Sequence, residues 1–282
     1  MQQADDKLQY GAKYMILSNC FVQKTRLYLR RGVERMEDQP GISLQGRYYR
    51  HYPPGKPLGL VEEKIDLGLG DTAFFLVDVY GLGYDADHDI GEVPEFYRKV
   101  ADKNRDIVVN HIKPAKEAAK RLGLPIVYVT NYLAPSTNEH NEWRNMSIRT
   151  CGVDVLESWS EPNDILKFSK VIAPEEGEYL INKQMYSGFF ETHLDSLLRT
   201  LGVRNLVTVG FDSRICLGTT VIDAMYRNYR VGVLRDCCST SEYPETEEGG
   251  WANWMAIRFI ESNVGYTATA EDFVKACEGV PT

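Results

Sequence analysis

Residues 205–224 (NLVTVGFDSRICLGTTVIDA) join a β-type run to a helix-compatible run that begins at Cys216. The apolar run 205–211 predicts a buried strand, and residues 216–229 predict a helix. At the start of a helix the backbone N–H groups lack intrahelical partners, and the helix dipole favours a thiolate. The position of Cys216 therefore suits a nucleophile, while a small buried core thiol is the alternative that this turn alone leaves open.

Polar residues also stand at the ends of two other apolar runs. Asp78 ends the run 72–78 (TAFFLVD), and Lys183 follows the run 179–182 (YLIN). Each is weak evidence alone, because Asp often begins a turn or caps a helix and most lysines are solvated. In an open parallel sheet, however, ligands bind at the carboxyl ends of the strands. The three residues together therefore indicate a site with a carboxylate, an ammonium and a thiol.

These segments resemble the isochorismatase-like cysteine hydrolases, also called the nicotinamidase-related amidohydrolases. The matching stretches are 74–78 (FFLVD), 181–194 (INKQMYSGFFETHL) and 210–224, within a resemblance that covers roughly residues 70–275. Three motifs in the right order make the resemblance specific. The stretch 186–190 (YSGFF) is most similar to the carbamoyl-cleaving branch, which includes ureidoacrylate amidohydrolase and biuret hydrolase.

The resemblance implies hydrolysis of a C–N bond in a small amide, ureido or carbamoyl compound. The family's triad maps onto Asp78 as general acid and base, Lys183 as electrostatic partner and Cys216 as nucleophile. A cis peptide before the cysteine maps onto the Phe211–Asp212 bond, with the Asp212 N–H as an oxyanion donor beside that of Cys216.

Residues around this triad are candidates for contacting the substrate. Asp212 replaces the small residue expected in the family, so its carboxylate or the neighbouring Arg214 could set a preference for substrate charge. Residues expected to bind substrate lie at or just after strand ends: Asn131, Tyr186, Phe189 and Phe190. The two phenylalanines could equally be core residues of the following helix.

No metal or other cofactor is expected. Metal-dependent nicotinamidases carry an Asp-x-His motif after the second strand, where this chain has Asn131-Tyr132-Leu133. The acidic cluster 85–89 (DADHD) lacks a recognised ligand spacing, and a solvated loop explains it better than a metal site. The alternatives are a nicotinamidase-like amidase, which the missing motif disfavours, a vinyl-ether-cleaving isochorismatase, and an inactive binding protein on the same fold.

Composition restricts the class of protein further. The 282-residue chain has a net charge of −8, which disfavours a nucleic-acid binder, and it contains no apolar run long enough to span a membrane. The first residues lack the pattern of a signal peptide, and the six cysteines show no C-x-x-C pair, so we expect a reducing, cytoplasmic setting. The adjacent Cys237 and Cys238 fit a strand-end pair with one thiol buried better than a redox pair.

The remaining pattern predicts a doubly wound α/β domain, with a mainly parallel sheet and helices on both faces. Expected strands lie at 72–78, 125–130, 178–182, 205–211 and 231–235, and expected helices at 94–122, 192–201, 216–229 and about 248–262. Residues 1–70 read as an extension of irregular structure or short strands, which could include a hairpin around Gly55, before a catalytic domain at 71–282. The extension could pack on a neighbouring subunit or on its own domain. By resemblance to relatives of this fold, we expect a homo-oligomer, a dimer or a tetramer.

Overall fold

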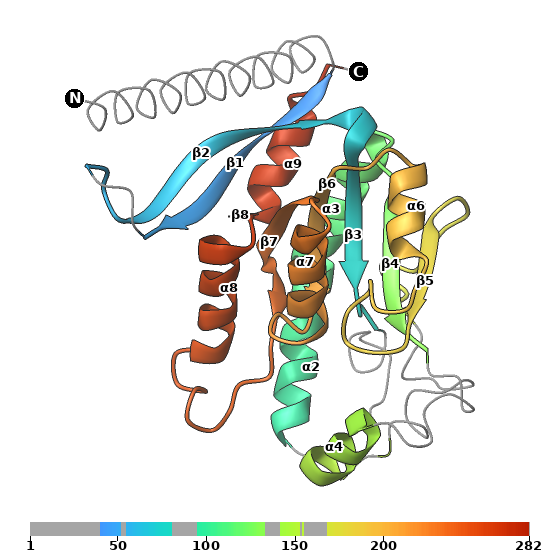
Figure 1. Cartoon of the computed structure of the whole chain (residues 1–282), viewed down its shortest axis with the longest axis vertical. Coiled ribbons are helices and arrows are strands. Elements are labelled where there is room, and N and C mark those ends of the chain that lie inside the picture. Colours follow the sequence, from blue (N-terminus) through green and yellow to red (C-terminus); the bar gives the residue numbers. More distant parts are fainter. Residues whose placement is uncertain are drawn as a thin grey trace, which may run out of the picture. The chain divides into compact units, whose positions relative to one another are not determined.

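A single eight-stranded sheet organises the residues that the computed structural model describes, which are 40–51, 55–80, 95–132, 142–152, 154 and 168–281 (Figure 1). The order of the strands across this sheet is β2-β1-β8-β7-β6-β3-β4-β5. Their bounds are β1 Gly41–Arg50, β2 Gly59–Gly68, β3 Thr72–Val77, β4 Ile126–Asn131, β5 Tyr179–Lys183, β6 Asn205–Phe211, β7 Arg230–Ser239 and β8 Tyr266–Ala268.

The strands from β3 to β8 are parallel, and their order creates a switch point. From β3 the chain adds β4 and β5 on one side, and then returns to add β6, β7 and β8 on the other side. The strands β3 and β6 therefore lie side by side although the chain winds away from them in opposite directions. In open α/β sheets a ligand site forms outside the carboxyl ends of the strands at such a point.

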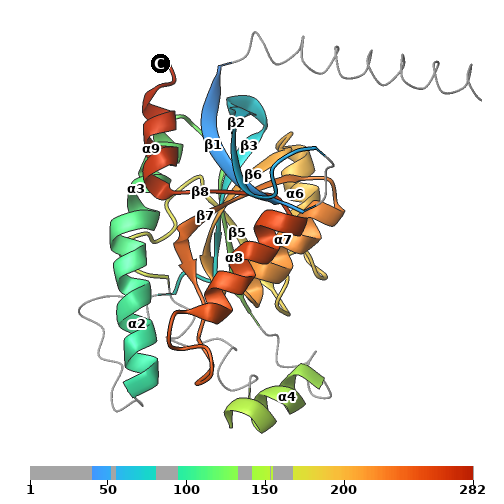
Figure 2. The same cartoon turned by 90° about the vertical axis from the view of Figure 1, so that its left-hand side faces the viewer.

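Helices cover both faces of the sheet, as the sequence predicts. Their bounds are α2 Glu95–Ile107, α3 Lys113–Arg121, α4 Glu142–Cys151, α6 Leu194–Thr200, α7 Cys216–Tyr226, α8 Trp251–Asn263 and α9 Ala270–Glu278. Figure 2 shows α2, α3 and α9 on one face and α6, α7 and α8 on the other. A π-helical turn at Val108–Ile112 joins α2 to α3, so that the expected helix at 94–122 is almost continuous.

Two apolar cores fill the layers between sheet and helices. The side chains of β3 alternate between them: Phe74 and Leu76 belong to the core under α3 and α9, and Phe75 and Val77 to the core under α6 and α7. Every residue of β3 is buried, because a parallel strand in the centre of a sheet has no solvated face. The doubly wound α/β fold expected from the sequence is confirmed.

The strands β1 and β2 form a hairpin, as the sequence allows around Gly55, but the strands are not short. Each of them is ten residues long. They pair in antiparallel register, and β1 also pairs with β8 through Arg47 and Thr267. This part of the chain thus packs on its own sheet. Residues 1–39 lie outside the described residues, and the division of the chain at residue 70 stays a prediction.

A buried ion pair fixes the hairpin to α8. The Glu261 side chain is fully buried, and its Oε1 accepts hydrogen bonds from Arg47 Nε at 2.7 Å and from Thr267 Oγ1 at 2.7 Å. Arg258 approaches the other carboxylate oxygen to 3.0 Å. A buried carboxylate is tolerated only when it is paired in this way. The pairing of Arg47 with Glu261 holds the hairpin in one position against α8.

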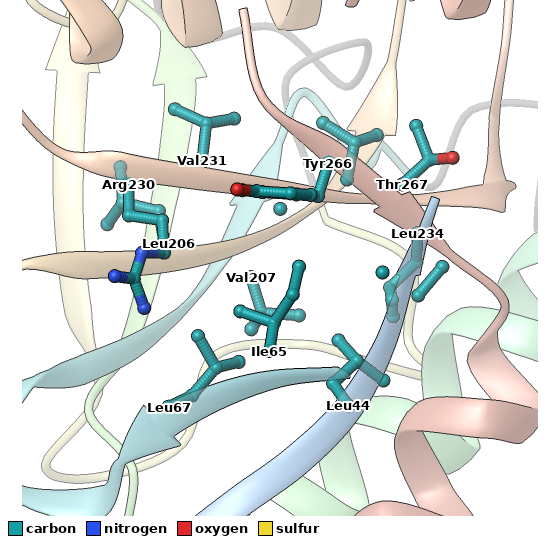
Figure 3. A pocket seen from close by; sticks show the side chains of 14 residues that line it. Leu44, Ile65, Leu67, Leu206, Val207, Arg230, Val231, Leu234, Tyr266 and Thr267 are labelled. Atoms are coloured by element: carbon teal, nitrogen blue, oxygen red, sulfur yellow. The ribbon is translucent and has the colours of Figure 1, made fainter. Parts of the chain in front are cut away.

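Apolar packing under the hairpin is nearly complete. Leu44, Ile65 and Leu67 face Leu206 and Tyr266 of the central sheet (Figure 3). The cavity left between these side chains measures about 10 Å³, which is close to the smallest space that holds one water molecule. The space is therefore a gap in the core, too small for a substrate.

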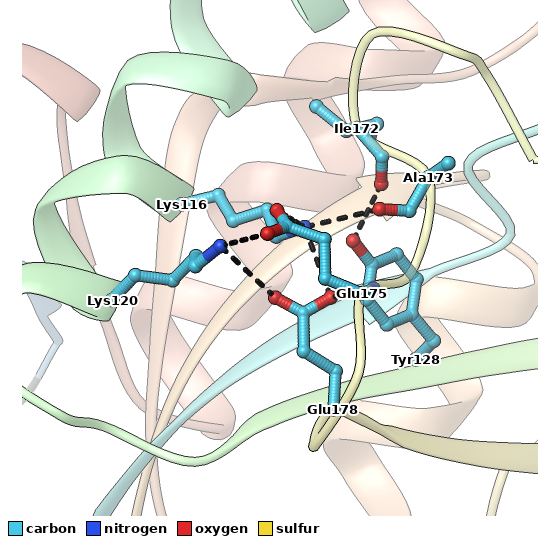
Figure 4. A network of polar contacts seen from close by, with 7 residues as sticks. All are labelled: Lys116, Lys120, Tyr128, Ile172, Ala173, Glu175 and Glu178. Atoms are coloured by element: carbon cyan, nitrogen blue, oxygen red, sulfur yellow. Dashed lines mark hydrogen bonds and ion pairs between the residues drawn. The ribbon is translucent and has the colours of Figure 1, made fainter.

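The segment that leads into β5 is fixed by a polar network (Figure 4). The buried Lys116 of α3 lies 3.0 Å from Glu178 and 3.4 Å from Glu175, and the Tyr128 hydroxyl donates to the carbonyl of Ile172. These contacts attach residues 172–178 to α3 and β4. The strand β5 begins directly after this segment, at Tyr179.

Gly210 allows β6 to approach β3 just before the turn that leads to Cys216. Its φ is +116°, and a Cβ atom there would lie 2.0 Å from the carbonyl oxygen of Val77. We expect Gly210→Ala to lower the free energy of unfolding by about 3 kcal/mol or more, because it combines backbone strain with a backbone clash.

The matched control is Gly123→Ala. Gly123 also has a positive φ, +71°, but nothing lies within 4 Å of its added Cβ, so about 1 kcal/mol is expected from strain alone. Urea unfolding of both variants provides the measurement. Equal losses in the two variants would mean that the close approach of β6 to β3 is not tight.

Candidate active site

Four side chains meet at the carboxyl edge of the sheet, on both sides of the switch point. Asp78 follows β3, Asn131 ends β4 and Lys183 ends β5, while Cys216 begins α7 after β6. The strands β3, β4 and β6 are buried along their length, whereas β5 lies at the edge of the sheet and exposes alternate residues. All four strands are parallel, so the polar residues at or after their ends lie at the same edge. Asp78 has a left-handed backbone, with φ of +49°, which Asp tolerates better than most residues.

The structure brings the three sequence-predicted catalytic residues into contact. Lys183 Nζ lies 2.9 Å from Asp78 Oδ2 and 3.5 Å from Cys216 Sγ. Asp78 and Lys183 are 4% and 0% exposed, so their ion pair is almost entirely removed from water. Lys183 also donates to Asn131 Oδ1. The lysine thus connects the carboxylate and the thiol through one buried ammonium group.

The environment of Cys216 favours the neutral thiol in the resting enzyme. Burial is the main cause that raises the pKa of Cys216 well above its ordinary value, and the Asp78 carboxylate raises it further. Lys183 acts in the opposite direction and lowers this pKa. For Cys216 to act as a nucleophile, a base would have to remove the thiol proton, and Asp78 is the carboxylate beside it.

Lys183 keeps its charge in this buried site. Burial lowers its pKa, but the negative charges of Asp78 and of a Cys216 thiolate outweigh that effect and raise the pKa above the ordinary value. The lysine is consequently a permanent cation at neutral pH. Such a group stabilises negative charge on the sulfur without exchanging a proton.

The Asp78 carboxylate is asymmetric. Its Oδ2 accepts the contact with Lys183 and a longer one, of 3.4 Å, from Asn131 Nδ2. Its Oδ1 is buried and accepts no hydrogen bond within the described residues. One oxygen is thus held in place, and the other has the capacity to take up a proton.

The turn before Cys216 presents backbone N–H groups. Cys216 is the first residue of α7, so its N–H has no carbonyl one turn earlier in the helix to which it could bond. The Phe211–Asp212 peptide bond is cis, as the family resemblance implies. The Asp212 carbonyl accepts hydrogen bonds from Ile215 and Leu217, which closes the turn.

The side chains of Asp212 and Arg214 bind the loop after β7. Asp212 accepts hydrogen bonds from Arg214 N at 2.8 Å and from Thr240 Oγ1 at 2.6 Å. The Arg214 guanidinium donates to Thr240, Ser241 and Tyr243 and lies over the Tyr243 ring. Both side chains therefore support the catalytic turn, which leaves little capacity for either to set a preference for substrate charge.

The residues expected to bind substrate lie in different environments. The Asn131 amide is 2% exposed and is engaged by Lys183 and Tyr80, which is at 2.7 Å. Phe189 packs in the core, against Leu194 and its neighbours, whereas Phe190 and Tyr186 are 46% and 38% exposed. The sequence left the two phenylalanines as substrate contacts or as core residues. Phe189 is a core residue, whereas Phe190 lies at the surface and is neither a core residue nor a buried contact.

The helix that begins at Cys216 also holds the loop after Lys183. Thr220 and Asp223 lie one and two turns along α7 on the face of Cys216. Gly188 N donates to Thr220 Oγ1 at 2.9 Å, and Ser187 Oγ donates to Asp223 Oδ2 at 2.5 Å. Cys216 and the loop that carries Tyr186 are thus positioned by one element.

Two residues in and around the site were missed by sequence reasoning. Tyr80 is buried and hydrogen-bonds to Asn131, and Trp143 of α4 meets the Tyr186 ring edge-on, with the ring centres 5.3 Å apart. Tyr80 stands two positions after Asp78, where an aromatic residue carries no distinctive signal. Trp143 is far from Tyr186 in the sequence, and their contact depends on the position of α4, which lies beyond the carboxyl ends of the strands (Figure 1).

The described residues contain no group of three or more His, Cys, Asp and Glu side chains that could hold a metal ion. The acidic cluster 85–89 lies outside them. Cys237 and Cys238 are unpaired and buried, and burial raises the pKa of both thiols, for Cys238 to about 12. Such thiols are unreactive at neutral pH, which supports buried thiols over a redox pair. No helix in the described part of the chain is long and apolar enough to cross a membrane.

Comparison with known proteins places this site in a family. Residues 95–271 match the family model described as the isochorismatase domain. A curated relative, the ureidoacrylate amidohydrolase RutB of Caulobacter segnis, is 30% identical over 183 residues, which cover 59% of this chain and 71% of RutB. RutB of Pseudomonas savastanoi is 26% identical over 239 residues, covering 78% of this chain and 91% of that protein.

Solved structures agree with this placement. A cysteine hydrolase from Pseudomonas syringae has a TM-score of 0.63 at 20% identity, over 75% of this chain and 94% of the other. N-carbamoylsarcosine amidase from Thermoplasma acidophilum has a TM-score of 0.52 at 25% identity, over 71% of this chain and 97% of the other. The chain belongs to the isochorismatase family and is an enzyme of the hydrolase class. The resemblance inferred from the sequence motifs is confirmed.

Proposed function

We propose that this protein is a cysteine-dependent amidohydrolase that cleaves a C–N bond in a small amide, ureido or carbamoyl compound. The observation that carries the proposal is the buried contact of Lys183 with both Asp78 and Cys216. The names of its relatives, ureidoacrylate amidohydrolase and N-carbamoylsarcosine amidase, support a carbamoyl or ureido group as the one attacked.

The first half of the reaction transfers the acyl group to sulfur. Asp78 Oδ1 takes the thiol proton while Cys216 Sγ attacks the substrate carbonyl, and Lys183 stabilises the negative charge at the sulfur. The carbonyl oxygen becomes an oxyanion, for which the backbone N–H groups of Asp212 and Cys216 are the donors. Collapse breaks the C–N bond, and the nitrogen leaves as ammonia or an amine with the proton from Asp78.

The second half returns the enzyme to its resting state. A water molecule attacks the thioester or thiocarbamate, and Asp78 accepts one of its protons. The C–S bond breaks, the acid or carbamate leaves, and the proton on Asp78 returns to the sulfur of Cys216. One water is consumed for each C–N bond cleaved, and no electron is gained or lost.

Substrate contacts would come from the loop after Lys183. Tyr186 is the candidate that the structure supports best, because its partly exposed ring is braced by Trp143. Asn131 acts through Lys183 in this proposal and orients the ammonium toward Asp78 and Cys216. Phe190 and Phe189 contribute shape around the loop rather than polar recognition.

The function is tested by an ammonia-release screen across ureidoacrylate, biuret, N-carbamoyl amino acids and nicotinamide. We expect release from one or more carbamoyl or ureido compounds, and the activity should persist after exhaustive chelation, because Cys216 and Asp78 supply the nucleophile and base. Release from nicotinamide alone, lost to a chelator and restored by metal, would replace this proposal with a metal-dependent nicotinamidase. No turnover in the whole panel would favour a binding protein.

We further propose a cytoplasmic homo-oligomer. The free thiols of the described part of the chain, at Cys216, Cys237, Cys238 and Cys277, suit a reducing compartment. The α8 surface exposes Trp251, Trp254, Met255 and Phe259, and aromatic side chains of this kind are enriched at interfaces between subunits. Light scattering measures the mass in solution.

A further inference from the structure

The loop at 184–190 is tied to the helix α7 by two hydrogen bonds. The Gly188 N–H donates to Thr220 Oγ1 at 2.9 Å, and the Ser187 hydroxyl donates to Asp223 Oδ2 at 2.5 Å. Thr220 and Ser187 are buried, and a buried polar group that loses its partner is costly to leave unpaired. The two contacts therefore select one position of the loop on the helix.

Close packing holds the same loop in that position. A Cβ atom at Gly188 would lie 2.9 Å from the Val129 side chain of β4 and 3.4 Å from that of Thr220, so the loop backbone lies directly against both elements. At the end of α7, the Arg227 guanidinium lies over the Phe189 ring, 4.9 Å from its centre. Polar and apolar contacts thus both fix this loop against the helix.

Tyr186 directly precedes the part of the loop that these contacts fix. Its ring is 38% exposed and meets Trp143 edge-on. Thr220 and Asp223 lie one and two turns along α7 from Cys216, on the same face. We propose that Thr220 and Asp223 are positioning residues, which hold Tyr186 in a fixed place relative to the nucleophile and so form one wall of the substrate site before substrate binds. This role rests on the proposed function, in which Tyr186 is a substrate contact.

Loss of this positioning should weaken binding more than it slows the chemistry. Tyr186 would meet a part of the substrate that does not react, while Lys183 keeps its contacts with Asp78 and Cys216. A contact that is equally strong in the bound substrate and in the transition state changes KM and leaves kcat almost unaltered. A variant that only destabilises the fold lowers the amount of active enzyme, which reduces the apparent kcat at unchanged KM. The two constants therefore separate positioning from stability.

The first test is Thr220→Val, which removes the acceptor of the Gly188 N–H and keeps the shape of the side chain. We expect KM to rise by about tenfold and kcat to stay within about threefold of the wild-type value. The matched control is Thr208→Val. Thr208 is also a fully buried threonine, but its hydroxyl has no hydrogen-bond partner within the described residues. This variant should keep both constants.

The second contact is tested at Asp223. Asp223→Ala removes the acceptor of the Ser187 hydroxyl and should raise KM in the same way, whereas Asp223→Asn keeps an acceptor oxygen and should stay within about threefold of the wild-type KM. Ser187→Ala removes the donor instead, and it takes the place of Thr220→Val in every test if that variant does not fold. An asparagine variant as impaired as the alanine variant would contradict a role for this hydrogen bond.

Tyr186→Ala shows whether the two contacts act through Tyr186. It should raise KM by itself, and adding Thr220→Val to it should produce no further rise, because the wall that Thr220 positions is already absent. A wild-type KM in Tyr186→Ala, rises that multiply in the double variant, or a fall in kcat at unchanged KM in Thr220→Val would each overturn the proposal.

Two NMR measurements keep the positioning role testable if no substrate is found. In Thr220→Val the Gly188 amide should exchange its hydrogen at least about tenfold faster relative to the amides of β3, and the ring signals of Tyr186, assigned through Tyr186→Ala, should move relative to the Trp143 ring current. Thr208→Val should change neither. An unchanged exchange rate or ring signal in Thr220→Val would refute the positioning role. Changes in both without turnover of any compound would support it and leave the amidohydrolase proposal to fail on its own.

Discussion

Cys216→Ala is expected to lower kcat by at least about a thousandfold in the ammonia-release assay, because removal of a covalent nucleophile leaves only binding and oxyanion stabilisation. The thiol lies 3.5 Å from Lys183 Nζ at the first residue of α7, where the geometry suits attack on a bound carbonyl. The fold should survive, since the change removes one sulfur atom from a half-buried position.

Cys277→Ala is the matched control. Cys277 is a free thiol of α9 and is buried in the core under α3 and α9, on the other face of the sheet from α7. Burial raises its pKa to about 12. Its removal should cost about 1 kcal/mol of stability or less and leave kcat unchanged. A Cys216→Ala enzyme that keeps more than about a tenth of wild-type kcat, with the control unchanged, would remove the cysteine from the mechanism.

Lys183→Met and Asp78→Asn are expected to abolish turnover and yet to shift the titration of Cys216 in opposite directions. Lys183 lowers the pKa of the thiol, so its loss should move the alkylation profile with iodoacetamide to higher pH. Asp78 raises the same pKa, so its loss should move the profile to lower pH and make the thiol easier to alkylate. Each shift should be about one pH unit or more, because Asp78 and Lys183 are buried beside the half-buried Cys216.

The opposite signs separate an electrostatic role from simple damage to the site. Lys116→Met offers a control, because Lys116 is also a buried lysine paired with a carboxylate, but its partner is Glu178 rather than Asp78. This variant should lose stability without moving the Cys216 profile. Shifts in the same direction for Lys183→Met and Asp78→Asn would contradict the assigned contacts.

Much of the fold and the centre of the site could be predicted from the sequence because both depend on local patterns. A buried parallel strand is a short apolar run, and Asp78 follows such a run directly, Lys183 ends one, and Cys216 follows one after a four-residue turn at 212–215. The carboxyl ends of neighbouring parallel strands meet at one edge, so three residues distant in sequence could be placed together before any distance was known.

Other features depend on contacts between distant segments and carry no local signal. The short strand β8 and helix α9 were missed, and the strands of the hairpin were expected to be short although they pair over ten residues. Its position depends on the pairing of Arg47 with Glu261, two residues far apart in sequence. Asn131 was expected to bind the substrate, and in the structure its amide contacts Lys183. The sequence cannot separate the two, because an amide at a strand end looks the same whether it faces a ligand or a buried lysine.

The central claim is that the acyl group of the substrate passes through Cys216. The most direct measurement is a single-turnover reaction with the compound identified in the ammonia screen, quenched in acid at short times and analysed by intact-protein and peptide mass. We predict a transient mass increase equal to the acyl or carbamoyl group, located on the peptide that contains Cys216, and decaying as product appears. An acyl group on any other residue, or product formed at the full rate with no mass increase at any time, would contradict it.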